Sequence, residues 1–196
     1  RPDLPPISGN VAAPPRVPPL SGHADVAPEH QHFLDRIIRT RGSISGVFQV
    51  MLHSPDMAER VANIGAFILY ETILQPETRT LTWLIAAREL DCDYAWIASV
   101  HAARAAGVGD ALIAGLEHGK LPASLAAQEK ALLDFCHQLL CGNHHVTDTT
   151  YRAAIDHFGV AATVQIAATI GYIVMLNLVA NAFDVAPQRD DSRPAL

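Results

Sequence analysis

Apolar residues recur at intervals of three and four along most of the chain beyond residue 28, which is the period of an amphipathic α-helix. Phe33, Ile37 and Ile38 form one such apolar stripe in the first segment. No run of strand length alternates apolar and polar residues. We therefore predict an all-α fold. The helices are predicted over residues 29–39, 44–52, 55–74, 76–88, 92–106, 108–118, 124–140, 149–158 and 160–183.

Capping residues mark the ends of several of these helices. Ser54 precedes a proline, which favours the first position of a helix, so Ser54 is predicted to cap the third helix. Asp91 is predicted to cap the fifth helix, and Ser124 the seventh. Gly107 is expected to end the fifth helix in a left-handed conformation, and Gly159 to separate the last two helices.

The last predicted helix is apolar nearly all round, and its first twenty-one residues are just long enough to span a bilayer. Gln165, Asn177 and Asn181 interrupt it, and no basic residues flank its ends closely. These features favour a buried or interface helix. We expect no membrane association.

Eight of the thirteen prolines lie in residues 1–28, which favours an extended N-terminal arm. Residues 29–185 are predicted to form a single helical domain, followed by a flexible tail over residues 186–196. The compartment is left open, with the cytoplasm favoured. The first residue, Arg1, in place of a methionine is consistent with a processed N-terminus.

The composition restricts the partners of this chain of 196 residues. Its hydrophobic content of 49% and charged content of 17% are apolar-rich for a soluble monomer, which indicates surface buried between subunits. The net charge of −6, with no clustered basic face, argues against a nucleic-acid partner.

The sequence gives no sign of a bound metal or cofactor. Cys92, Cys136 and Cys141 form no disulfide framework and lack zinc-site spacing. His137 and Cys141 are four residues apart on one helix, but they supply only two ligands. There is no glycine-rich phosphate loop and no GxSxG motif. We expect neither a metal nor a cofactor.

The candidate chemistry gathers on the helix that begins at Cys92. At about 100° per residue, Trp96 and Ser99 lie on the same side as Cys92, whereas Tyr94 and His101 share a stripe nearly opposite. Because His101 lies about 180° around the helix from Cys92, any base for this thiol must come from another helix or subunit.

Each of these residues has a functional and a purely structural interpretation, and the sequence pattern alone does not decide between the two. Cys92 is either a buried, unreactive cysteine or a thiol activated by the helix N-terminus. His53 and His101 serve either in packing and hydrogen bonding or as acids and bases. Tyr94 and Trp96 belong either to the core or to a pocket wall.

Four blocks of the sequence resemble the carboxymuconolactone decarboxylase family, which shares its fold with the alkyl hydroperoxidase D (AhpD) proteins. They are RGSISGVFQVMLHSP, ILQPETRTLTWLIAAREL, CDYAWIASVHAARAAGV and GYIVMLNLVANAF. The resemblance covers roughly residues 40–185. It implies an AhpD-like helical bundle that assembles as a homotrimer or homohexamer, with a pocket near the Cys92 helix.

The chain departs from both branches of that family. In the peroxidase branch, Cys92 matches the first cysteine of the CxxC pair, but Ala95 stands at the second, Ser99 at the histidine and Thr80 at the glutamate. In the decarboxylase branch, Trp96 matches the tryptophan, while Ala95 and Ser99 replace the glutamate and the histidine. The resemblance therefore implies a changed reaction, and a thiol peroxidase of the usual kind is the least favoured outcome.

The resemblance favours a cofactor-free enzyme that acts on a small cyclic or aromatic-derived organic acid or lactone. The expected reaction is a decarboxylation, elimination or isomerisation by acid/base catalysis. The alternative is a catalytically silent oligomeric binding or assembly protein. The acid/base candidates are His53, Tyr94 and His101. The substrate-binding candidates are Arg41, Trp83, Arg88, Cys92, Trp96 and Ser99.

Overall fold

The computed structural model describes residues 14–187, and this part of the chain is helical without any strand, which confirms the all-α prediction. Residues 1–13 of the predicted arm and residues 188–196 of the predicted tail lie outside the described residues. Two short 3-10 turns, His23–Asp25 and Pro28–His30, precede the helices. The helices are α1 (Gln31–Arg41), α2 (Val47–Met51), α3 (Pro55–Tyr70), α4 (Pro76–Glu89), α5 (Asp93–Ala105), α6 (Asp110–His118), α7 (Ala127–Leu140) and α8 (Asp148–Ala182).

Helix α4 forms the centre of the core. It packs against α5, α6, α7 and α8, and ten of its fourteen residues are buried. A helix buried on all sides has to satisfy its polar side chains internally. Thr80 and Thr82 do so, because their hydroxyls donate to the carbonyls of Pro76 and Thr78, at 2.8 Å each.

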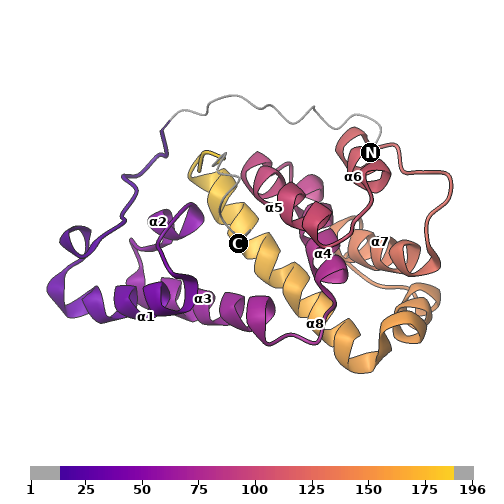
Figure 1. Ribbon diagram of the computed structural model, residues 1–196, viewed down its shortest axis with the longest axis horizontal. Coiled ribbons are helices and arrows are strands. Elements are labelled where there is room, and N and C mark those ends of the chain that lie inside the picture. The colour runs from indigo at the N-terminus through magenta and orange to yellow at the C-terminus, as the bar shows by residue number, and fades with distance from the viewer. Residues whose placement is uncertain (1–13, 188–196) are drawn as a thin grey trace.

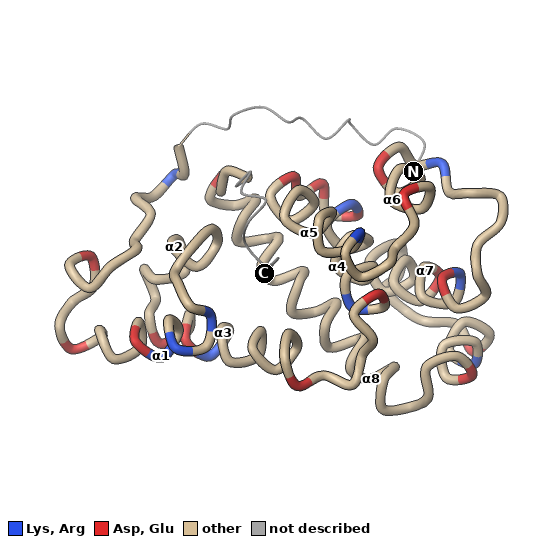
Figure 2. The backbone as a smooth tube through the Cα atoms, viewed as in Figure 1, with Lys and Arg blue, Asp and Glu red and all other residues tan. Residues whose placement is uncertain are grey.

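Helix α8 separates the other helices into two groups (Figure 1), with α1, α2 and α3 on one side and α4 to α7 on the other. Its residues beyond Gly159 carry no charge, as Figure 2 shows along the diagonal of the molecule. Ile166, Ile173 and Leu176 are almost completely buried there. This apolar face lets one helix pack against both groups at once.

Among the described residues, α8 is long and apolar enough to cross a membrane when judged by length and composition alone. A core helix meets the same two criteria. Gly159, with φ 77° and ψ 167°, breaks the helix, as the sequence predicts. The segment beyond Gly159 packs on α4, and this packing is typical of a core helix.

Several helix ends differ from the prediction. Asp91 is not a cap: it adopts a left-handed conformation with φ 47°, and Cys92 is the N-cap residue of α5. Ser124 does not cap α7 either. That helix starts after Ala126, whose backbone N–H donates to the side chain of Glu129 at 2.8 Å. Glu129 thus supplies the cap from inside the helix.

The described part of the N-terminal arm runs along the helical domain. The backbone N–H of Arg16 donates to the carbonyl of Phe183 at 3.0 Å, and that of Leu20 donates to Gln49 at 3.0 Å. Arg16 also pairs with Asp184. The arm therefore connects the end of α8 to α2.

Candidate functional site

Four residues from three parts of the chain form a buried polar group, which we call the Arg–Tyr cluster. They are Arg41 at the end of α1, Cys92 and Tyr94 at the start of α5, and Tyr172 in α8. The positive charge of Arg41 lowers the pKa of Tyr94, whereas ionisation of Cys92 or Tyr172 would raise it, so the four groups lie close enough to interact. The cluster lies where both groups of helices meet α8.

Tyr94 is held by the turn that leads into α2. Its hydroxyl accepts a hydrogen bond from the backbone N–H of Val47 at 3.2 Å, which leaves its own proton available for donation. Gly46 makes room for the phenol, since a Cβ there would overlap the Tyr94 hydroxyl. Burial raises the pKa of Tyr94 to about 12, so the phenol is protonated at neutral pH.

The position of Arg41 is set by the end of α1 and by contact with the Phe48 ring. Helix α1 stops at Gly42, which has φ 77°, and the guanidinium carbon of Arg41 lies 4.3 Å from the centre of the Phe48 ring. Its buried Nη1 atom has no hydrogen-bond partner among the described residues. The Arg41 guanidinium thus packs on Phe48, and within residues 14–187 no carboxylate is paired with it.

Tyr172 faces the same space from α8. A Cβ at Gly65 of α3 would lie 2.9 Å from Arg41 Nη1 and would overlap the Tyr172 hydroxyl, so both groups occupy the space that the glycine leaves. Among the described residues, that hydroxyl interacts with the Arg41 guanidinium but forms no well-aligned hydrogen bond. Burial raises the pKa of Tyr172, and the charge of Arg41 opposes that rise.

Cys92 completes the cluster as a neutral thiol. Its Sγ lies 3.9 Å from the backbone carbonyl of Asn177, to which it donates. Burial raises the pKa of Cys92 to about 11, and Asp93 adds to this rise. Nearby backbone N–H groups oppose it without cancelling it. At neutral pH the cluster therefore presents one cation and three groups that retain their protons.

The positions that hold the peroxidase relay in the resembling family are buried here but carry different chemistry. Thr80, Ala95 and Ser99 are each at most 3% exposed. The Thr80 hydroxyl is used within α4, while the Ser99 hydroxyl has no partner in the described part of the chain. None of the three can relay a proton to or from Cys92 as a carboxylate and an imidazole would.

The two histidines predicted as acids or bases lie outside the cluster. His53 is exposed, and its Nε2 is 2.9 Å from the carbonyl oxygen of Pro18 in the arm. His101 is also exposed, although it shares a helical stripe with the buried Tyr94. The turn before α2 covers the first residues of α5, where Tyr94 lies. The catalytic roles of both histidines stay predictions.

The remaining candidates are buried in the helical core. Trp83 and Trp96 are 2% and 3% exposed and belong to the core of α4 and α5. Arg88 is buried and pairs with Asp91 at 3.6 Å, so it stabilises the joint between these two helices. Of the predicted site residues, Arg41, Cys92 and Tyr94 are the ones that the fold brings together.

Sequence reasoning missed Tyr172 and Phe48. A phenol in an otherwise apolar helix was a usable signal, because a buried hydroxyl requires a partner. Tyr172 is the only tyrosine between Gly159 and Phe183. Phe48 gave no such signal, since an aromatic residue in a short apolar helix is typical of the core.

The ionisation of the cluster predicts a loss of stability at high pH. Cys92 has a pKa of 9.0 when exposed and about 11 in the fold, so folding favours the neutral thiol. Its stabilising contribution is complete below pH 9 and is lost as the pH rises to 11. We expect the loss from this thiol to be about 2–3 kcal/mol.

Urea unfolding in the presence of a reductant, at intervals between pH 8 and 11, measures this loss. In Cys92→Ala the unfolding free energy should fall less steeply over that range, because one of the ionising groups is gone. The unfolding free energy of the variant should still decrease with pH, because burial also raises the pKa values of Tyr94 and Cys136 to about 12. Equal slopes in the two proteins would contradict the prediction.

Comparison with solved structures identifies the fold. The chain is similar to a peroxidase-related protein of Ralstonia eutropha JMP134 with an alkylhydroperoxidase AhpD core. The TM-score is 0.72, with 20% identity over 93% of this chain and 95% of that one. It is also similar to the debrominase Bmp8, with a TM-score of 0.68 and 18% identity over 91% and 92% of the two chains. A cysteine-to-alanine form of Bmp8 in complex with 2,3,4-tribromopyrrole matches equally well, with a TM-score of 0.68.

No protein-family model matches the chain, and no curated protein matches it. The structural neighbours nevertheless agree with one another. The chain has the AhpD-like helical fold, as the four sequence blocks predict, and the suspected resemblance is confirmed at the level of the fold.

Proposed function

We propose that the chain is a cofactor-free enzyme, similar to carboxymuconolactone decarboxylases, that acts on a small cyclic or aromatic-derived organic acid. The observation that carries this proposal is the Arg–Tyr cluster, where Arg41 Nη1 and the Tyr172 hydroxyl interact with each other but form no well-aligned hydrogen bond among the described residues. Buried polar groups are normally hydrogen-bonded. Unsatisfied donors gathered in one place are therefore expected where a polar ligand binds.

Arg41 is suited to hold the carboxylate of such a substrate. Its guanidinium is always charged and can form two parallel hydrogen bonds to a carboxylate. The ring of Phe48 beneath it fixes the plane of the guanidinium. The ring of the proposed substrate is in keeping with the debrominase Bmp8, a protein of similar fold whose variant is seen in complex with 2,3,4-tribromopyrrole, whereas the carboxylate is inferred from Arg41 alone.

The phenols and the thiol are suited to an enolate-like intermediate. In a decarboxylation, the C–C bond to the carboxyl group breaks, its electron pair moves towards a carbonyl oxygen of the substrate, and CO2 leaves. The protonated Tyr94 can donate a hydrogen bond to that developing oxyanion. Cys92 can then transfer its proton to the substrate carbon, and the thiolate takes up a proton again when the product leaves and water enters the site. Isomerisation and elimination can pass through the same kind of anion.

Deuterium exchange tests this proposal without knowledge of the true substrate. The full chain is incubated in D2O with a panel of small aromatic-derived and alicyclic keto acids and lactones. NMR then follows deuterium incorporation next to the carbonyl, and mass spectrometry follows loss of CO2. We expect exchange or CO2 release with at least one member of the panel. If neither the exchange nor the binding of any member exceeds that of Arg41→Ala, the chain is the silent scaffold.

We also infer that the chain assembles as a homotrimer or homohexamer. Support comes from large apolar side chains that are exposed along α3 and α8, among them Ile64, Phe67, Val164 and Leu178. Exposed apolar residues that follow one helix face are typical of a subunit interface. Light scattering coupled to size-exclusion chromatography tests this, and a monomer at micromolar concentration contradicts it.

A further inference from the structure

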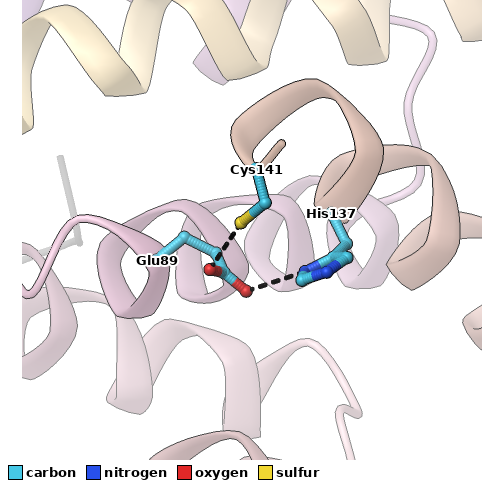
Figure 3. Close-up of side chains that lie close together, drawn as sticks. All are labelled: Glu89, His137 and Cys141. Atoms are coloured by element: carbon cyan, nitrogen blue, oxygen red, sulfur yellow. Dashed lines mark hydrogen bonds and ion pairs between the residues drawn. The ribbon is translucent and has the colours of Figure 1, made fainter. Parts of the chain in front are cut away.

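A second group of reactive side chains lies where the C-terminal ends of α4 and α7 meet, and none of its members belongs to the Arg–Tyr cluster. Glu89 is the last residue of α4, while His137 and Cys141 come from the last turn of α7 and its C-cap. Figure 3 shows the three side chains pointing toward one another. The Cys141 Sγ donates to Glu89 Oε2 at 2.9 Å, and His137 Nδ1 lies 3.2 Å from Glu89 Oε1.

We propose that Glu89, His137 and Cys141 bind a zinc ion. One ligand atom from each residue lies within 4.8 Å of the other two. Ligands of a tetrahedral zinc ion, with bonds of about 2.0–2.3 Å, are roughly 3.3–3.8 Å apart, so only small side-chain rotations separate this arrangement from a coordination shell. The set of sulfur, imidazole nitrogen and carboxylate oxygen suits zinc, whereas magnesium and calcium prefer oxygen alone.

The electrostatic potential around Glu89, His137 and Cys141 favours binding of a cation and disfavours a reactive thiolate. Two helices end here, and the C-terminus of each helix carries a partial negative charge. The carboxylate of Glu89 adds a full negative charge beside the Cys141 sulfur. This charge opposes a thiolate nucleophile, but it stabilises a bound cation. Zinc would displace the proton of the thiol into solvent, and the two negative ligands would neutralise the ion.

The remaining coordination position faces a pocket. The three ligands line a surface pocket of about 450 Å³, together with Leu140, Gly142 and His144. The Nδ1 of His144 bonds the carbonyl of Leu139 at 2.9 Å, so in the neutral imidazole Nε2 is left as an acceptor. Water can therefore occupy the fourth position, with an imidazole at the edge of the pocket to accept a hydrogen bond from it.

The sequence alone supplied only the pair His137 and Cys141, for which we expected no metal. Glu89 is 48 residues before His137, and the packing of α4 against α7 makes it the third ligand. Bound zinc would join the ends of these two helices. It would also hold the joint between α4 and α5, which begins immediately after Glu89.

Metal titration of the full chain tests the proposal. After dialysis against a chelator and a reductant, zinc is added and followed by calorimetry and elemental analysis, with one ion per chain expected. Cobalt(II), used as a spectroscopic substitute, should give the charge-transfer absorption of a cobalt–thiolate bond and the visible bands of tetrahedral coordination. The affinity for zinc should rise on the order of tenfold per pH unit while one proton is released on binding.

Variants assign the ligands. Cys141→Ser should abolish the cobalt–thiolate absorption, and both Cys141→Ser and Glu89→Gln should weaken zinc binding by at least about 100-fold. His145→Ala is the matched control, because His145 is an exposed histidine of the same loop that is not among the proposed ligands, and it should bind zinc normally. Circular dichroism establishes that each variant is folded.

Zinc should also raise the melting temperature of the wild-type chain and leave that of Cys141→Ser unchanged. This measurement does not depend on the catalytic activity proposed for the Arg–Tyr cluster, so the two proposals fail separately. The proposal is overturned if the wild-type chain binds zinc no more tightly than Cys141→Ser, or if its cobalt complex lacks the thiolate absorption.

Discussion

Replacement of Arg41 by alanine is expected to reduce kcat/KM for the exchange reaction by about 100- to 1000-fold, the range typical of losing one donor that stabilises a developing charge. The proposed substrate would lose its carboxylate partner, and the neutral donors around it cannot replace a cation. The folded chain should tolerate the change, because Arg41 Nη1 forms no well-aligned hydrogen bond among the described residues and loses only its interaction with the Tyr172 hydroxyl. We expect the unfolding free energy to change by no more than about 1 kcal/mol, mainly from the lost contact with Phe48.

Arg39→Ala is the matched control. Arg39 belongs to the same last turn of α1 but is exposed, so the variant should retain full activity. Arg41→Lys retains the charge but loses the planar guanidinium, and its activity should be intermediate. The assay is NMR-detected exchange together with urea unfolding. If the unfolding free energy of Arg41→Ala fell by as much as its activation free energy rose, the loss of activity would be explained by a damaged fold. Arg41 would then be a structural residue and not part of the site.

Helices and their breaks were predictable because they depend on neighbouring residues. The period of apolar residues and the positions of Gly107 and Gly159 give the order of the helices as the structure has it. The start of α5 was misplaced because Asp91 adopts φ 47°, which a sequence pattern does not show. The start of α7 was misplaced because its cap comes from Glu129, inside the helix.

The cluster depends on contacts between distant segments, and these were only partly predictable. Arg41 and Tyr94 were candidates from the resemblance, but their convergence requires α1, α5 and α8 to pack around one point. Tyr172 was recognisable as a lone phenol in an apolar helix, but nothing in the sequence placed it beside Arg41 and Tyr94. Tyr94 and His101 share one helical stripe, so the sequence alone did not distinguish the buried residue from the exposed one. Tyr94 is buried because the turn before α2 covers it. The position of that turn cannot be worked out from the helical geometry of α5.

The same reasoning explains why the proposed zinc site escaped the sequence search. Metal motifs are found by short spacings, and His137 with Cys141 satisfies only half of a motif. The third residue, Glu89, looked like an ordinary helix-ending carboxylate. Its position opposite α7 follows from the burial of α4 at the centre of the fold. Motif searches therefore miss sites whose ligands come from the ends of different helices.

Gly65→Ala is expected to impair the Arg–Tyr cluster through one added methyl group. The Cβ would overlap the Tyr172 hydroxyl and lie 2.9 Å from Arg41 Nη1, so both side chains must move out of the arrangement that the glycine permits. Overpacking of this kind costs typically about 1–3 kcal/mol. We expect kcat/KM for the exchange reaction to fall by on the order of tenfold to 100-fold, because a displaced guanidinium no longer meets the substrate carboxylate.

Gly171→Ala provides the matched control, because it makes the same change in a helix of the same core. Gly171 is exposed in α8, and its Cβ would meet no atom within 4 Å. Alanine is the better helix former by about 1 kcal/mol, so the variant should be slightly more stable. Because Gly171 lies on the same face of α8 as Val164 and Leu178, light scattering first establishes that the variant assembles like the wild type, and its activity should then be that of the wild type. Measured side by side, the two variants separate the effect of a methyl group on a helix from its effect on the cluster. Gly65→Ala with full activity would mean that Arg41 and Tyr172 do not form the reaction centre.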